Sequence, residues 1–232
     1  MINANIIRAV FINYAKDTKK NRKSMLAFVL IPVLAYLMQF ILGDTTHKEH
    51  LSMIFMYLGM HCTLIPIMSS ASAVAQDKEK NTLRAMMMNG VSPFEYLIGV
   101  SAFNILLTVA FSSLFVIMAA DVSVVGRIYL AALLCSMIST LIGLTIGAYA
   151  QNMTAATSLT MVIGLPLMLL TAYSNISPAL EKYANVLYNK QAMNVLADEG
   201  LINGKSLFVI GCNFIIVIIL FVVAFQKTKF DD

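Results

Sequence analysis

Six long apolar segments, separated by shorter polar ones, dominate the pattern along the chain. They are 18 to 25 residues long, close to the ~20 residues that an α-helix needs to cross a hydrocarbon core, and lie at Met25–Leu42, Leu51–Ala75, Leu97–Ala120, Ile128–Ala150, Met153–Tyr173 and Leu207–Phe225. The alternating pattern of barrel strands does not occur. The pattern therefore predicts six transmembrane α-helices.

Charge and composition agree with this interpretation. All 28 charged side chains, 16 basic and 12 acidic, fall outside the six segments, as expected because a charge at the centre of a span costs ~2.5–3.5 kcal/mol. Apolar residues make up 59% of the chain, charged residues only 12%, and the mean hydropathy is +0.79. This balance excludes a cytosolic enzyme, a nucleic-acid-binding protein and a disordered chain. We expect an all-α integral membrane protein with one transmembrane domain over residues 1–232.

The distribution of Lys and Arg predicts the orientation. The N-terminal arm, the segment between the second and third spans and the C-terminal tail together hold 11 of them, whereas the opposite side holds 5. Because cytoplasmic loops are richer in Lys and Arg, both termini are expected in the cytoplasm. The expected location is a cell membrane, most simply a bacterial plasma membrane.

The N-terminal segment Met1–Ser24 has an amphipathic helical pattern followed by a basic run. The residues that share its apolar face are Ile6, Ile7, Val10, Phe11 and Tyr14. This pattern predicts a helix in the cytoplasmic membrane interface, with its basic residues near lipid headgroups. A flexible basic tail is the alternative. A cleavable signal peptide is not expected, because no small-residue cleavage site precedes Gly43.

The expected spans contain few groups that could perform chemistry. No Asp or Glu lies in a span, and the zinc and serine-hydrolase motifs are missing. His61 is the only ionisable side chain there apart from Cys and Tyr; it either lines a substrate path or bonds to a neighbouring helix. Residues 200–206 resemble a P-loop but have three residues between the glycines where that motif needs four. We expect no catalytic site, bound cofactor or metal in this chain.

The segment between the second and third spans has a defined pattern. Residues Asp77–Met88 can form a short helix with Leu83, Met86 and Met87 on one face, and Asn89-Gly90 can end it. Ser92-Pro93-Phe94-Glu95 then matches a capping box that starts the next helix. From the residues alone, the short helix is either a rigid lever gripped by a soluble partner or an ordinary solvated connector.

This segment resembles the characteristic segment of type-two ABC transporter (ABC-2 type exporter) permeases. The matching residues are Asp77, Glu79, Thr82, Leu83, Arg84, Met87, Ser92 and Pro93. The N-terminal interfacial helix and the six-span layout extend the resemblance over the whole chain. The chain departs from the family pattern at two positions: Asn81 stands where the family usually has Gly, and Val100 stands where Lys is common.

The resemblance implies a permease domain with defined partners. Two permeases would pair, as a homodimer or heterodimer, and two cytosolic ABC ATP-binding subunits, which bind ATP and Mg²⁺, would grip the coupling helices at residues 76–91. The residues that the resemblance assigns to this contact are Asp77, Glu79, Thr82, Leu83, Arg84 and Met87. Among them, Leu83 and Met87 would fill an apolar groove, and Glu79 and Arg84 would set the register.

Two further segments concern helix packing. Leu180, Tyr183, Ala184 and Leu187 share a helical face after Pro178, which suits a surface helix or a re-entrant one, and the resemblance favours re-entrant helices within residues 174–206. In the fourth span, small residues recur at every fourth position: Ala131, Cys135, Ser139, Gly143 and Gly147. Such a stripe predicts close helix packing within the chain. Cys62, Cys135 and Cys212 lie inside spans and are expected to pack as small apolar residues.

The cargo is expected to be hydrophobic or amphipathic: peptides, toxins, drugs or lipids. The chain contains 16 Met and no Trp, and Met supplies adaptable apolar contacts. The resemblance extends to the subgroup of permeases that export amphipathic toxin or antimicrobial peptides. A lipid-linked polysaccharide exporter and a non-transporting membrane assembly or sensor protein are the alternatives.

Overall fold

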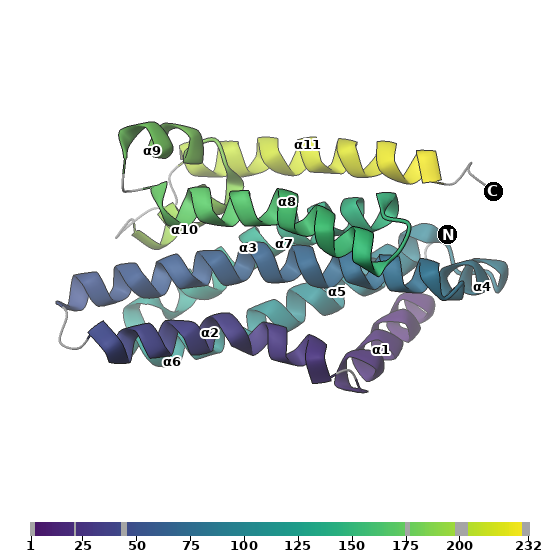
Figure 1. Ribbon diagram of the computed structural model, residues 1–232, viewed down its shortest axis with the longest axis horizontal. Coiled ribbons are helices and arrows are strands. Elements are labelled where there is room, and N and C mark those ends of the chain that lie inside the picture. The colour runs from purple at the N-terminus through teal and green to yellow at the C-terminus, as the bar shows by residue number, and fades with distance from the viewer. Residues whose placement is uncertain (1–2, 21, 43–45, 175–176, 198–203, 229–232) are drawn as a thin grey trace.

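The computed structural model describes residues 3–20, 22–42, 46–174, 177–197 and 204–228, and this part of the chain consists of helices and turns. The elements are α1 (Ala4–Lys20), α2 (Arg22–Leu42), α3 (His47–Glu79), α4 (Thr82–Met88), α5 (Pro93–Phe111), α6 (Ser113–Ala119), a 3₁₀ turn η1 (Val122–Val124), α7 (Val125–Tyr149), α8 (Met153–Ala172), α9 (Pro178–Ala184), α10 (Tyr188–Ala197) and α11 (Gly204–Thr228). The long helices form an elongated bundle (Figure 1).

Six helical stretches in the described part are long and apolar enough to cross a membrane, which confirms the all-α class and the six spans. They are Met25–Leu42, Glu49–Glu79, Pro93–Ala119, Val122–Tyr149, Met153–Ala172 and Gly204–Ala224. The second and third are longer than expected. Their ends include the acidic residues Glu49, Asp77, Glu79 and Glu95, which lie outside the apolar segments predicted from the sequence.

The third span is interrupted, although the sequence predicted one helix. Its first helix, α5, ends at Phe111 and α6 starts at Ser113. The Ser112 hydroxyl donates to the Thr108 carbonyl oxygen at 2.9 Å, and the Ser113 hydroxyl donates to that of Ala110 at 2.7 Å. Serine side chains that bond to backbone carbonyls in this way bend helices.

The helix α3 lies at the centre of the bundle and packs most extensively against α7 and α8. Two glycines of α7 permit the close approach. A Cβ at Gly147 would lie 2.8 Å from the Ala71 carbonyl oxygen, and one at Gly143 would collide with Ser70 and the Ile67 backbone. Ala131, Cys135 and Ser139 are fully buried. The stripe of small residues in the fourth span is thus confirmed as packing within the chain.

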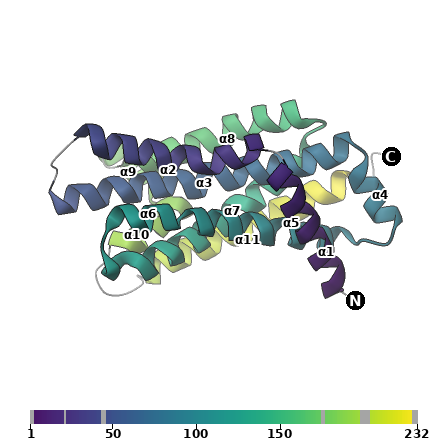
Figure 2. The ribbon, with the colours of Figure 1, turned by 90° about the horizontal axis from the view of Figure 1, so that it is seen from below.

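The start of α1 and the end of α11 lie at the same end of the bundle as α4, and α9 and α10 lie at the opposite end (Figure 1). This arrangement follows from an even number of spans. The helix α1 runs obliquely to the long helices at the α4 end, as Figures 1 and 2 both show. The orientation of this end with respect to the cytoplasm stays a prediction.

The predicted apolar face of α1 packs against α5. A Cβ at Gly99 would lie 2.7 Å from Cγ1 of Val10, and the rings of Phe11 and Tyr14 have centroids 5.6 and 5.8 Å from that of Phe103. The helix is therefore ordered by contacts with the bundle. Its location in a lipid interface stays a prediction, and residues 1–2 of the predicted segment lie outside the described part.

The structure corrects the predicted face between the fifth and sixth spans. The helix α9 ends at Ala184, so Leu187 is not on it, and Leu180 and Tyr183 are exposed. Of the predicted face only Ala184 is fully buried, and further buried residues lie on α10, where Tyr188 and Asn189 insert into the bundle. Residues 198–203, which include most of the P-loop-like segment, lie outside the described residues.

Candidate functional site: the charged end of α3 and the helix α4

The last three residues of α3 bind three different helices. The Tyr96 hydroxyl on α5 donates to Oδ2 of Asp77 at 2.7 Å. Nζ of Lys78 donates to the carbonyl oxygens of Ala148 and Ala150, at 2.7 and 2.9 Å, where α7 ends. We call Asp77, Lys78 and Glu79 the α3 clamp.

Glu79 completes the clamp at the start of α8. Its Oε2 accepts a hydrogen bond from the backbone N–H of Met153 at 3.0 Å. The first N–H groups of a helix and the last carbonyls have no partner within the helix, and their partial charges favour an anion at the start and a cation at the end. Lys78 therefore brings a positive charge and hydrogen-bond donors to the carbonyl groups at the end of α7. Glu79 brings a negative charge and an acceptor to the N–H groups at the start of α8.

A left-handed residue separates the clamp from α4. Asn81 has φ 56° and ψ 13°, a conformation that Asn adopts more easily than most residues. The helix α3 ends with the Lys80 N–H bonded to the Gln76 and Lys78 carbonyls, and α4 begins at Thr82. The predicted single helix Asp77–Met88 is thus two helices, and Asp77 and Glu79 belong to the long one.

The helix α4 turns part of its apolar surface toward its own chain. Leu83 and Met86 pack against a buried cluster that includes Val74 and Tyr96. Arg84 is exposed, Thr82 and Met87 are half-buried, and Met88 is 75% exposed. The large apolar side chain that α4 exposes is therefore Met88, whereas Leu83, which was expected to fill a partner's groove, packs toward the bundle.

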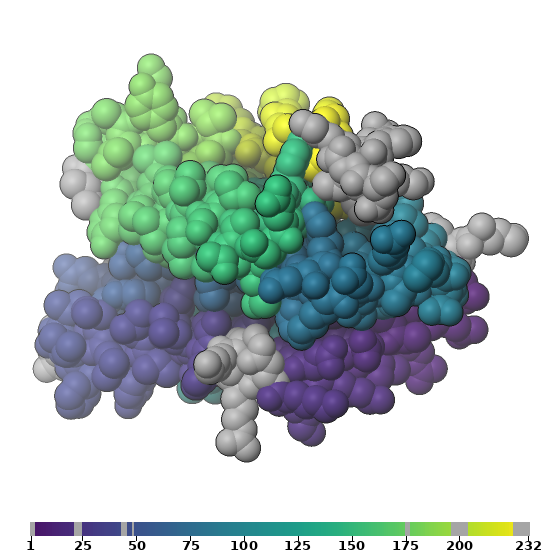
Figure 3. Space-filling view, turned by 45° about the vertical axis from the view of Figure 1, so that its right-hand side comes forward, coloured from purple at the N-terminus to yellow at the C-terminus, as the bar shows by residue number. Residues whose placement is uncertain are grey.

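Glu95 was not singled out for a role in this site, yet it joins two helix starts. Its Oε2 accepts from the N–H and the hydroxyl of Ser92, at 2.9 and 2.7 Å, which confirms the predicted capping box. Its Oε1 accepts from the N–H of Asn3 at 2.6 Å, at the start of α1. The spacing of Ser92 and Glu95 reveals the cap, but the contact with Asn3 depends on a residue 92 positions away. Figure 3 shows α1 and the α3–α4 turn adjoining on the surface at this end.

His61, on α3, is fully buried against α6. Its ring lies tilted against Phe115, with centroids 5.6 Å apart. Its polar neighbour is the Thr108 backbone, although neither ring nitrogen reaches hydrogen-bonding geometry with a described residue. A role of His61 in a substrate path stays a prediction.

Buried hydrogen bonds hold α10 within the far end of the bundle. The hydroxyls of Tyr188 and Ser139 are 2.8 Å apart. Nδ2 of Asn189 donates to the Leu167 carbonyl oxygen at 2.9 Å and to the Thr63 hydroxyl at 3.3 Å. The α10 segment is thereby fixed to α3, α7 and α8 together.

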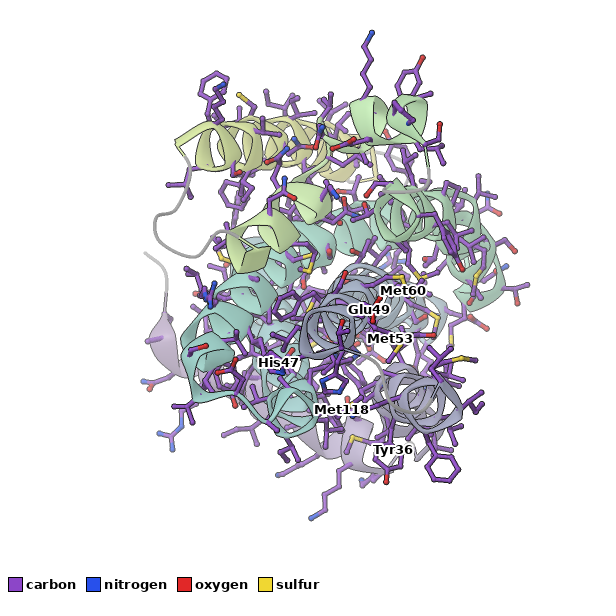
Figure 4. The ribbon with its side chains drawn as sticks, turned by 90° about the vertical axis from the view of Figure 1, so that its left-hand side faces the viewer. Tyr36, His47, Glu49, Met53, Met60 and Met118 are labelled. Carbon is purple, nitrogen blue, oxygen red and sulfur yellow. The ribbon has the colours of Figure 1, made fainter. Side chains whose placement is uncertain are left out.

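A cleft of about 530 Å³ opens beside α10. Five methionines line it: Met38, Met53, Met56, Met60 and Met193. Glu49 and Lys190 add one acidic and one basic group to its wall. Figure 4 views this end of the bundle, where Glu49, Met53 and Met60 come from the same side of α3. The cleft is predominantly apolar and its lining is flexible, because Met has three rotatable bonds.

Six spans, with a short helix held at one end by a charged clamp, define a multi-pass membrane protein. The sequence pattern of the ABC-2 type transporter family matches residues 5–198. The chain therefore belongs to that family and is the transmembrane permease domain of an ABC transporter, its non-catalytic component. No curated protein matched the chain.

Proposed function

We propose that this chain is the permease subunit of an ATP-driven exporter whose helix α4 is gripped by a cytosolic ATP-binding subunit. The observation that carries the proposal is the α3 clamp. It fixes the helix adjoining α4 to α5, α7 and α8 through Asp77, Lys78 and Glu79. The ATP-binding subunit would bind ATP and Mg²⁺, and both termini of the permease would lie in the cytoplasm.

The clamp suggests how motion spreads from α4. Closely packed helices move as rigid bodies more readily than they deform. A displacement of α4 acts on α3 through the Asn81 turn and on the bundle through the Leu83 and Met86 contacts. Because α3 also holds the end of α7 and the start of α8, these helices would follow.

The contact with the ATP-binding subunit would centre on Arg84 and Met88, the exposed long side chains of α4. Thr82 and Met87, which are half-buried, would lie at its edge. Asp77, Glu79 and Leu83 bind their own chain, and we assign them to transmission of the movement behind the contact.

The proposed cargo is hydrophobic or amphipathic. Support comes from the methionine-lined cleft, whose Glu49 and Lys190 can orient a polar group while the methionines contact apolar surface. A second permease, identical or related, would complete the path. Amphipathic peptides combine both properties and are our preferred cargo.

The test is reconstitution in proteoliposomes with the ATP-binding subunit from the adjacent reading frame. We expect amphipathic peptides to stimulate ATP hydrolysis, and Met88→Asp to abolish the stimulation and the co-purification of the two subunits. Lys182→Asp, on α9 at the other end, is the control. If the subunits do not associate, the exporter assignment is wrong. If they associate but only a lipid-linked glycan stimulates hydrolysis, the cargo assignment is wrong.

A further inference from the structure

A second cleft, of about 570 Å³, lies at the α4 end of the bundle between α1, α2, α3 and α5. It is separate from the methionine-lined cleft and shares only Thr82 with the edge of the proposed contact with the ATP-binding subunit. Along α3 it extends from Ile65 to Asp77, which is about 18 Å at the helical rise of 1.5 Å per residue.

The two parts of this cleft differ in chemistry. Phe28, Ile65 and Phe103 give it apolar surface along the span, where Ser69 and Ser72 of α3 also line it. At the end nearest α4 the lining carries charges of both signs, Asp17 and Lys20 from α1 and Asp77 and Lys80 from the end of α3. The cleft thus offers an apolar slot that continues into a mouth with anionic and cationic groups.

Asn104 lines this cleft with an unused hydrogen-bond donor. The residue is 2% exposed, and its Nδ2 has no hydrogen-bond partner among the described residues. Buried polar atoms are nearly always paired, because leaving one unpaired costs about 1–3 kcal/mol. A buried amide donor in the wall of an open cleft indicates a ligand that brings an acceptor.

The charged groups of the mouth are available to a ligand. Asp77 accepts the Tyr96 hydrogen bond through Oδ2, so its Oδ1 can accept a hydrogen bond from a ligand. No described basic side chain forms an ion pair with Asp17 or Asp77. Burial, with the nearby Asp77 and Asp17, raises the pKa of Tyr14, which also lines the cleft. Its hydroxyl therefore stays protonated and can donate.

We propose that this cleft binds a zwitterionic phospholipid with a primary-amine headgroup, taken from the leaflet around the α4 end. The ammonium group meets Asp17 and Asp77, and the phosphate meets Lys20 and Lys80. An ester carbonyl accepts from Nδ2 of Asn104, and one acyl chain fills the apolar slot. The lipid joins α1 to α3 as a resident ligand, independently of any ATP-binding partner.

The test uses the full chain in nanodiscs with tryptophan fluorescence. Because the chain contains no Trp, Met68→Trp places a single reporter in the cleft lining, and Leu220→Trp on the exposed surface of α11 is the matched control. Lipids with brominated chains and ethanolamine, choline or glycerol headgroups are titrated into an unbrominated background. Choline has no N–H donor, and the glycerol headgroup makes the lipid anionic.

We expect saturable quenching of the Met68→Trp reporter, with the ethanolamine lipid binding about tenfold more tightly than the choline lipid, the factor expected for one charge-assisted hydrogen bond. The Leu220→Trp control should show no preference. Asp17→Asn should reduce the preference, and because Asp17 is exposed the substitution carries little risk to folding. Asn104→Leu should weaken the binding of the ethanolamine and choline lipids alike, because both carry the ester carbonyl that Asn104 is proposed to bind. Equal or unsaturable quenching by all three lipids, or tightest binding of the anionic lipid, would overturn the proposal.

Discussion

The ammonium group of Lys78 donates a hydrogen bond to the Ala148 carbonyl oxygen at 2.7 Å, so a side chain of α3 closes the end of α7. Lys78→Met keeps a long apolar stem but removes both bonds to α7. We expect the free energy of unfolding to fall by about 1–3 kcal/mol, because a hydrogen bond from a charged group contributes about that much. Thermal unfolding in nanodiscs measures the change. Lys182→Met, on the exposed surface of α9, is the control and should unfold like the wild type.

The close approach of α1 to α5 depends on Gly99. In Gly99→Ala, the new Cβ would lie 2.7 Å from Cγ1 of Val10 and 3.1 Å from the Ile7 carbonyl oxygen, so α1 must shift. Overpacking of this kind typically costs about 1–3 kcal/mol. Gly126→Ala, whose Cβ would meet nothing within 4 Å, should be neutral or stabilising by about 0.5–1 kcal/mol. Equal stability of the two variants would contradict the assigned packing of α1.

Leu83 and Met88, five residues apart on α4, should respond differently to substitution. Leu83→Asp places a charge against the buried cluster of Val74 and Tyr96, and we expect it to lower the unfolding temperature of the permease alone. Met88→Asp should leave that temperature unchanged, since the side chain is 75% exposed. Co-purification with the ATP-binding subunit should fail in Met88→Asp even though the permease is folded. If instead Met88→Asp retains the partner, α4 does not contact it through this residue.

The hydroxyl pair of Tyr188 and Ser139 should help to hold α10 in place. Tyr188→Phe and Ser139→Ala each remove one partner of the 2.8 Å contact, and a double-mutant cycle isolates their coupling. We expect a coupling of about 0.6–1.7 kcal/mol, the range for hydrogen bonds between membrane helices. Tyr183→Phe, on the exposed side of α9, is the control. A coupling near zero would mean that packing alone positions α10.

The pattern of apolar positions was sufficient to predict the six spans, because the preference of each segment for lipid over water depends on its own residues. It does not show which partners the charged groups just beyond the apolar segments bind: Asp77 accepts from Tyr96, and Glu95 accepts from Asn3. The break at Ser112 was also missed, because serines inside an apolar run do not show which carbonyl they will bond to. The capping box of Ser92 and Glu95 was predicted correctly, since both of its residues lie within one turn.

The sequence by itself determined the membrane class, the six spans, the helical nature of the N-terminal segment, the stripe of small residues on α7 and the resemblance to the ABC-2 family. Each depends on composition or on residues a few positions apart. Only the tertiary structure decided that Asp77, Lys78 and Glu79 hold three different helices, that Leu83 faces inward while Met88 faces outward, and that Asn104 lines a cleft with α1. The physical reason is that the free groups at helix ends and in clefts are satisfied by residues distant in the chain, and their identity depends on how the helices pack.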